Sequence, residues 1–128
     1  MTARVSLIAG LISLLGVLVA CGGSSDPVVR GKQIYDKQGC NACHSIGGQG
    51  GTTGPDQTRL AANAEGRIKD PGYKGNARDA AGYIRESILQ PGAYVLPGFP
   101  DNLMPTTFGQ QLSAQDLDDL VSYLLTLK

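Results

Sequence analysis

Residues 39–48 read GCNACHSIGG, and this short segment determines how the rest of the 128-residue chain is interpreted. Cys40 and Cys43 are three positions apart, and His44, the only histidine in the sequence, follows directly. A zinc site is disfavoured because zinc takes four ligands, usually in two separated pairs, and no second pair follows. A redox-active dithiol is disfavoured because that motif belongs to a βαβ context, and no strand pattern precedes Cys40. A chance triplet in a structural loop is the third alternative.

The same spacing fits covalent attachment of a haem. C-x-x-C-H is the attachment signature of a c-type haem. Each thiol adds across one vinyl group of the porphyrin, and the histidine beside the second cysteine becomes an axial ligand of the iron. The segment therefore predicts one haem c per chain, bound covalently through Cys40 and Cys43, with His44 as an iron ligand.

The second axial ligand has one candidate. Methionine is the usual partner of histidine where a haem carries electrons. The sequence has two methionines, and Met1 would leave with the N-terminal segment described below. Met104 lies in DNLMPTTF, where Pro100 and Pro105 disfavour a helix or a central strand. We therefore predict Met104 as the sixth ligand of the iron; a methionine that fills a gap in the core is the alternative.

The N-terminal residues predict export. Residues 5–20, VSLIAGLISLLGVLVA, follow Arg4 and carry no charge. As a helix they would be roughly 24 Å long at about 1.5 Å per residue, which is short of the ~20 residues of a membrane span. A basic residue, an apolar segment and then small residues are typical of a secretory signal peptide, so residues 1–20 are predicted to be one. An uncleaved membrane anchor is the alternative.

The end of this segment, LVAC at residues 18–21, resembles the lipobox of bacterial lipoproteins. The resemblance implies that the chain is cut before Cys21, that Cys21 carries lipid, and that residues 21–26 form a short flexible tether. Residues 27–128 would then be a domain tied to the membrane on its extracytoplasmic, periplasmic face. Only Cys40 and Cys43 would remain as thiols, and a disulfide between them would close a small loop and restrain little chain entropy.

Composition limits the remaining possibilities. Eleven basic and eleven acidic residues balance, so no nucleic-acid partner is expected, since such a partner usually requires a basic excess. Eighteen glycines and only seven aromatic residues, five tyrosines and two phenylalanines, indicate a loop-rich chain with little bulky core material. A large apolar cofactor would help to fill such a core.

Three segments are predicted to be helical. Residues 27–37 begin with a capping Asp26 and a proline at the first helical position. Residues 80–89 follow a second capping aspartate, Asp79, and the last helix opens with the capping-box pair Ser113 and Asp116. No segment alternates with a period of two, and residues 45–78 show little regular pattern. The sequence therefore predicts a small all-α domain of three to five helices, with long loops wrapped around the haem.

Together these features resemble the monohaem class I cytochromes c over residues 27–128. Besides the haem motif, Gly31, Tyr35 and Tyr123 match positions where that family's terminal helices cross closely. GPD at residues 54–56 resembles the family's Gly-Pro loop, which implies that the carbonyl of Pro55 accepts the proton from the far nitrogen of His44. The glycine-rich segment GGQGGTTGP at residues 47–55 departs from the family pattern.

Residues 83–99, YIRESILQPGAYVLPGF, followed by LMP at 103–105, resemble two branches of the family. One is the cytochrome c domain fused to some haem-copper oxidase second subunits. The other is the lipid-anchored monohaem subunit of alternative complex III. These resemblances imply other redox subunits, or an oxidase or cytochrome, as partners.

The expected function is the transfer of single electrons in a respiratory or photosynthetic chain. An iron with histidine and methionine ligands has no vacant position for a substrate, so the protein is expected not to be an enzyme. It would accept electrons from a quinol-oxidising complex, as a docked subunit, and pass them to an oxidase or a soluble carrier. A free lipid-anchored electron shuttle is the alternative, and a haem peroxidase or a sensor would need an open iron position.

Overall fold

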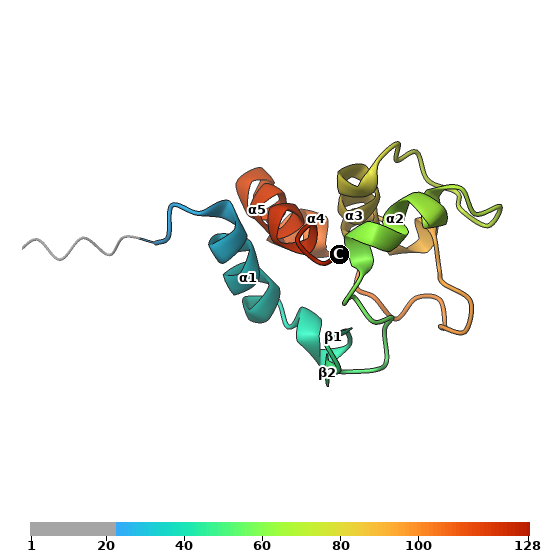
Figure 1. Cartoon of the computed structure of the whole chain (residues 1–128), viewed down its shortest axis with the longest axis horizontal. Helices are drawn as coiled ribbons and strands as arrows, with labels where there is room; N and C mark the ends of the chain where they lie inside the picture. The colour runs from blue at the N-terminus through green and yellow to red at the C-terminus, as the bar shows by residue number, and fades with distance from the viewer. Residues whose placement is uncertain (1–22) are drawn as a thin grey trace, which may run out of the picture.

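The computed structural model describes residues 23–128 (Figure 1). The predicted signal peptide, residues 1–20, and the predicted lipidation site Cys21 lie outside the described residues. Within the described part, the chain forms five α-helices, two single 3₁₀ turns and one antiparallel pair of two-residue strands. The helices are α1 (Pro27–Lys37), α2 (Leu60–Ile68), α3 (Ala80–Leu89), α4 (Phe108–Gln111) and α5 (Ala114–Leu124), and the strands are β1 (Ser45–Ile46) and β2 (Gln49–Gly50).

The three predicted helices are confirmed, and each begins where its capping residue lies. The Asp26 carboxylate accepts a hydrogen bond from the Val28 amide at 2.8 Å at the start of α1. Asp79 does the same for the Gly82 amide at 2.7 Å in α3. Ser113 and the third helical residue of α5 form a complete capping box. Local capping chemistry therefore determines where these helices begin.

The structure differs from the sequence prediction between residues 45 and 78, where it adds a helix and a hairpin. Helix α2 buries Leu60, Ala61 and Ala64, although no side chain caps its N-terminus. The strands β1 and β2 are joined by Gly47 and Gly48, whose φ angles of 59° and 79° lie in the left-handed region. Glycine adopts that region without steric cost, which explains the glycine-rich departure at this point.

Helices α1 and α5 cross at close range, as the family resemblance implied. A Cβ atom on Gly31 would lie 2.0 Å from the backbone oxygen of Asp119, so the crossing admits only glycine at this position. Beside it, the rings of Tyr35 and Tyr123 meet edge to face with their centroids 5.5 Å apart. The guanidinium of Arg30 donates to both oxygens of the buried Asp119 carboxylate, at 2.6 and 2.7 Å. Packing and a bidentate ion pair together hold the two helices.

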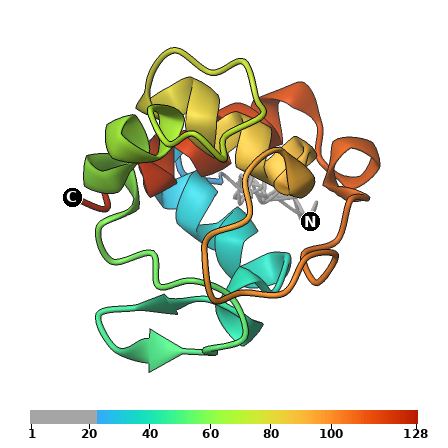
Figure 2. The ribbon, with the colours of Figure 1, turned by 90° about the vertical axis from the view of Figure 1, so that its right-hand side faces the viewer.

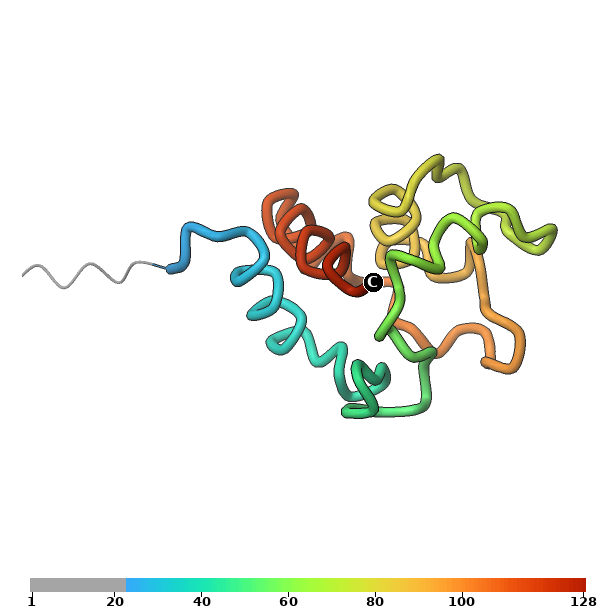
Figure 3. Tube along the Cα trace, viewed as in Figure 1, coloured from blue at the N-terminus to red at the C-terminus, as the bar shows by residue number. Residues whose placement is uncertain are grey.

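One apolar core joins α5, α1 and α3, and its largest fully buried side chain is Ile84. The tube in Figure 3 shows α1 leading directly into the 3₁₀ turn at Cys40–Ala42, called here the haem-motif turn, and then into the hairpin of β1 and β2. The segment after α3, orange in Figure 2, runs back toward that turn. Among residues 23–128, no helix combines the length and the apolar character that crossing a membrane requires.

Candidate cofactor site

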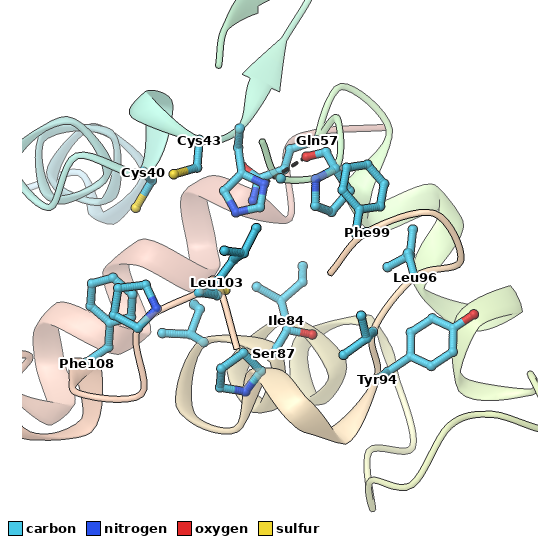
Figure 4. A pocket seen from close by; sticks show the side chains of 18 of the residues that line it. Cys40, Cys43, Gln57, Ile84, Ser87, Tyr94, Leu96, Phe99, Leu103 and Phe108 are labelled. Carbon is cyan, nitrogen blue, oxygen red and sulfur yellow. Dashed lines mark hydrogen bonds between the residues drawn. The ribbon is translucent and has the colours of Figure 1, made fainter. Parts of the chain in front are cut away.

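A cavity of about 370 Å³ opens between the haem-motif turn, α3 and the segment that follows α3. The structure brings all five predicted site residues of the domain to its wall: Cys40, Cys43, His44, Pro55 and Met104. Figure 4 shows the two cysteines at one end, with Tyr94 at the opposite end. The wall between them is mostly apolar and includes the side chains of Ile84, Leu96, Phe99, Leu103 and Phe108.

The haem-motif residues share one side of a tight turn. Gly39 adopts a φ of 70°, which ends α1 and starts a single 3₁₀ turn. The amides of Cys43 and His44 both donate to the carbonyl oxygen of Cys40, at 3.2 and 3.0 Å. This turn directs the two thiols and the imidazole toward the same cavity.

Both cysteines are free thiols. Burial is the main cause that raises the pKa of Cys40 to about 11, so this group is protonated near neutral pH. A redox-active dithiol needs a cysteine with a lowered pKa. Within residues 23–128, no three His, Cys, Asp or Glu side chains are grouped so that they could hold a metal ion. The geometry thus gives no support to the dithiol or to the zinc alternative.

The imidazole of His44 is held in place by the backbone of Pro55. Its Nδ1 lies 2.8 Å from the carbonyl oxygen of Pro55, the contact that the family resemblance implies. A carbonyl can only accept, so Nδ1 carries the proton, and the tautomer that this contact selects has its lone pair on Nε2. A Cβ atom on Gly54 would lie 2.7 Å from Cε1 and 2.9 Å from Nδ1, so the absence of a side chain there leaves room for the ring.

A network that the sequence did not predict ties the Pro55 loop to the rest of the fold. Asp56 accepts from the Ser45 hydroxyl at 2.6 Å and from the Thr58 amide at 2.9 Å. These hydrogen bonds, that of Ser45 first, lower the pKa of the Asp56 carboxyl. The Tyr35 hydroxyl donates to Gln57 at 2.9 Å and so connects the same loop to α1. The only sequence signal was the aspartate in GPD, which is a common turn former.

Met104 lies in an irregular segment between α3 and α4, as Pro100 and Pro105 led us to expect. It is half-buried, lines the cavity and also packs against the apolar core. The structure therefore places a soft sulfur ligand in the wall of the cavity that also holds His44.

The far end of the cavity holds a tyrosine cluster. The rings of Tyr73, Tyr83 and Tyr94 lie with their centroids 6.1 to 6.4 Å apart. The guanidinium of Arg67 stands 5.9 Å from the centroid of the Tyr83 ring. Arg67 is the only cation, and Asp101 the only carboxylate, among the described residues that line the cavity. Sequence patterns did not indicate this arrangement, because α2 itself was not predicted.

These features fit a covalently bound haem. The mostly apolar walls suit a porphyrin, the two free thiols at one end suit its vinyl groups, and an imidazole nitrogen with a free lone pair suits iron. Met104 lines the same cavity, and a methionine thioether is a ligand type that haem iron accepts.

Comparison with known proteins gives two findings. The family model described as cytochrome c matches residues 28–128. A curated relative, the cytochrome c oxidase subunit 2 of Alkalihalophilus pseudofirmus, is 29% identical over 100 residues, which are 77% of this chain and 25% of the relative. The chain thus spans about a quarter of the length of that relative.

Proposed function

The chain belongs to the cytochrome c family, and we propose that it binds one haem through Cys40 and Cys43 and carries single electrons. The observation that carries this proposal is the meeting of four groups in one apolar cavity: the two thiols, the His44 ring held by Pro55, and Met104. The bound haem would supply an iron that changes by one electron. The protein's own residues would hold that iron in one environment in both oxidation states.

Each residue has a distinct part in this proposal. Cys40 and Cys43 would fix the edge of the haem, and His44 would bind iron through Nε2 while Pro55 keeps its ring oriented. Such a hydrogen bond raises the basicity of a ligating histidine. Met104 would close the opposite side, and methionine raises the reduction potential relative to a second histidine. With His44 and Met104 both bound to the iron, no position would be left for a substrate, and the protein would act as an electron carrier and not by itself as an enzyme.

A membrane anchor outside the cytoplasm is part of the proposal, and it rests on the lipobox-like LVAC ending at Cys21. The start of the domain adds support. Arg30 donates to the carbonyl oxygens of Ser24 and Ser25 at 3.0 and 2.7 Å. Only Gly22 and Gly23 then lie between the anchor at Cys21 and Ser24, the first residue that Arg30 holds against the domain. Three residue steps reach at most about 10 Å, so an anchored domain would stay against the membrane surface.

We further propose that the protein works as a docked subunit of a quinol-oxidising membrane complex. It would deliver electrons to an oxidase or a soluble carrier in a respiratory or photosynthetic chain. Two points support this: the short tether that lipidation of Cys21 would leave, and the similarity to a chain that is itself an oxidase subunit. Lengthening the tether by about 20 Gly/Ser residues should then barely change turnover, because docking contacts position the domain. A large change would favour a free lipid-anchored shuttle.

Carbon monoxide binding separates the carrier from a peroxidase or a gas sensor. If Met104 occupies the second axial position, the reduced protein should bind carbon monoxide slowly or not at all. Rapid, stoichiometric binding by the native protein would indicate an open iron position and would contradict the carrier proposal. Met104→Ala serves as the positive control, because it should open that position.

A further inference from the structure

Charged residues avoid the segments that frame the mouth of the cavity. Residues 38–55 contain no Asp, Glu, Lys or Arg, and residues 87–115 contain one, Asp101. The chain as a whole has 22 such residues, so these two segments are unusually poor in charge. Figure 2 shows the segment after α3 (orange) running toward the turn from which the hairpin of the first segment extends.

This surface also exposes apolar and neutral groups. Leu103 is 51% exposed and, with Val29, is one of the two exposed large hydrophobic residues in the described part of the chain. It lines the cavity (Figure 4) and directly precedes Met104 in the chain. In the first segment, Cys43 and Thr53 also line the cavity and are exposed. We call the exposed parts of residues 38–55 and 95–107 the uncharged rim.

We propose that the uncharged rim is the docking surface for an electron-transfer partner whose own contact surface is uncharged and apolar. This inference rests on the proposed function. Burying the rim removes Leu103 from water and separates almost no charge from solvent. A partner with a charged patch would lose the hydration of its charges here and find one carboxylate, Asp101, and no cation among the rim residues. Charge complementarity therefore selects a neutral partner surface.

The rim also predicts how the partner arrives. Charged interfaces steer association and are strongly sensitive to salt, whereas neutral ones associate at about 10⁵–10⁶ M⁻¹s⁻¹ without steering. Contact through the rim should therefore be almost independent of ionic strength. Such a surface suits a partner that is held nearby in the same membrane assembly, where long-range attraction is not needed.

Electron self-exchange between reduced and oxidised holoprotein provides the test. A second copy of the chain is the probe because it presents the same rim, and one electron passes from the reduced copy to the oxidised copy with no net reaction. We expect the rate constant to change less than about twofold between ~0.01 M and ~1 M ionic strength, over which the Debye length falls from about 30 Å to about 3 Å. A change of about tenfold or more in wild type would overturn the proposal.

Leu103→Glu tests the surface directly. It places like charges face to face, so exchange should slow about tenfold at low salt and recover as salt rises. Val29→Glu is the matched control, because Val29 is a comparably exposed residue that does not line the cavity. Its rate should equal that of wild type. Equal rates for Leu103→Glu and Val29→Glu would overturn the proposal.

A second rim variant is needed because Leu103 directly precedes Met104, so that a change at Leu103 can also affect the haem site. Thr53→Glu changes the other segment of the rim, residues 38–55, and should slow exchange in the same salt-dependent way. The reduction potential and the absorption spectrum of each variant show whether its haem site is intact. If the wild type takes up no haem or does not cycle between two oxidation states, the proposed function fails. If it cycles but the rim variants exchange like wild type, only the docking inference fails.

Discussion

Gly54→Ala should disturb the His44 ring without disturbing the backbone. Gly54 does not adopt a positive φ angle, so alanine is sterically allowed there. Its Cβ would nevertheless lie 2.7, 2.9 and 3.2 Å from three atoms of the ring. Carbon atoms in contact prefer about 3.5–4.0 Å, so the ring must withdraw by roughly 1 Å. The 2.8 Å contact between His44 and Pro55 would lengthen to about 3.6 Å or more, which is no longer a hydrogen bond.

The expected effect is a higher reduction potential. Without the Pro55 carbonyl as hydrogen-bond acceptor, His44 is a less basic ligand. A less basic ligand stabilises ferric iron less. A hydrogen bond contributes about 0.5–1.5 kcal/mol net. With a tenfold change in the equilibrium constant equal to about 59 mV for one electron, the potential should rise by roughly 20–60 mV.

Spectroelectrochemical titration of the two proteins measures this shift. Gly92→Ala is the matched control, because Gly92 lines the same cavity but a Cβ atom added there would meet nothing within 4 Å beyond its chain neighbours. Its potential should stay at the wild-type value. If Gly54→Ala also leaves the potential unchanged, the Pro55 contact does not tune His44 and the reasoning is refuted.

Four further predictions address the fold, the second ligand and the anchor. Gly31→Ala forces a Cβ into the backbone of Asp119, so its free energy of unfolding, measured by thermal unfolding, should fall by about 1–3 kcal/mol. Gly66→Ala has open space around the new Cβ, so its free energy of unfolding should rise by up to about 1 kcal/mol. Equal effects of the two substitutions would contradict the crossing geometry. The hydrogen bonds from Arg30 lower the pKa of Asp119 in the folded protein. The stability that this carboxylate contributes is therefore fully present above its unfolded pKa of about 3.9, and it is lost as the pH falls through the lower folded pKa. Urea midpoints should therefore fall on acidification, and less steeply in Asp119→Asn; identical acid slopes would refute this. Met104→Ala should keep the haem but lose the weak long-wavelength band that methionine gives to ferric cytochromes c; a mutant that retains the band would exclude Met104 as ligand. Cys21→Ser should abolish labelling by a fatty acid while haem content stays the same, and equal labelling would remove the lipoprotein proposal.

The sequence predicted the elements whose signals are local. The bounds of α1 and α3 agree with the structure because Asp26 and Asp79 act within one helical turn of their own positions. Helix α2 was missed because no side chain caps it and its buried face is made partly of alanines, Ala61 and Ala64, which give little apolar periodicity. Its burial depends on contacts with α3 and is not visible locally.

The candidate site divides in the same way. Cys40, Cys43 and His44 were recognisable because their chemistry depends on spacing along the chain. Arg67 at the tyrosine cluster, and Gln57 in its contact with Tyr35, were not recognisable. Their partners come from other helices, so only the tertiary structure brings them together.

The intact mass of the exported protein, measured after denaturation, tests the central claim most directly. Covalent attachment through both cysteines predicts one species, heavier than the processed polypeptide by the mass of one haem. Replacing Cys40 and Cys43 together by alanine should remove that increment. A denatured wild-type protein with the mass of the polypeptide alone would contradict the assignment of this chain as a carrier with one covalent haem.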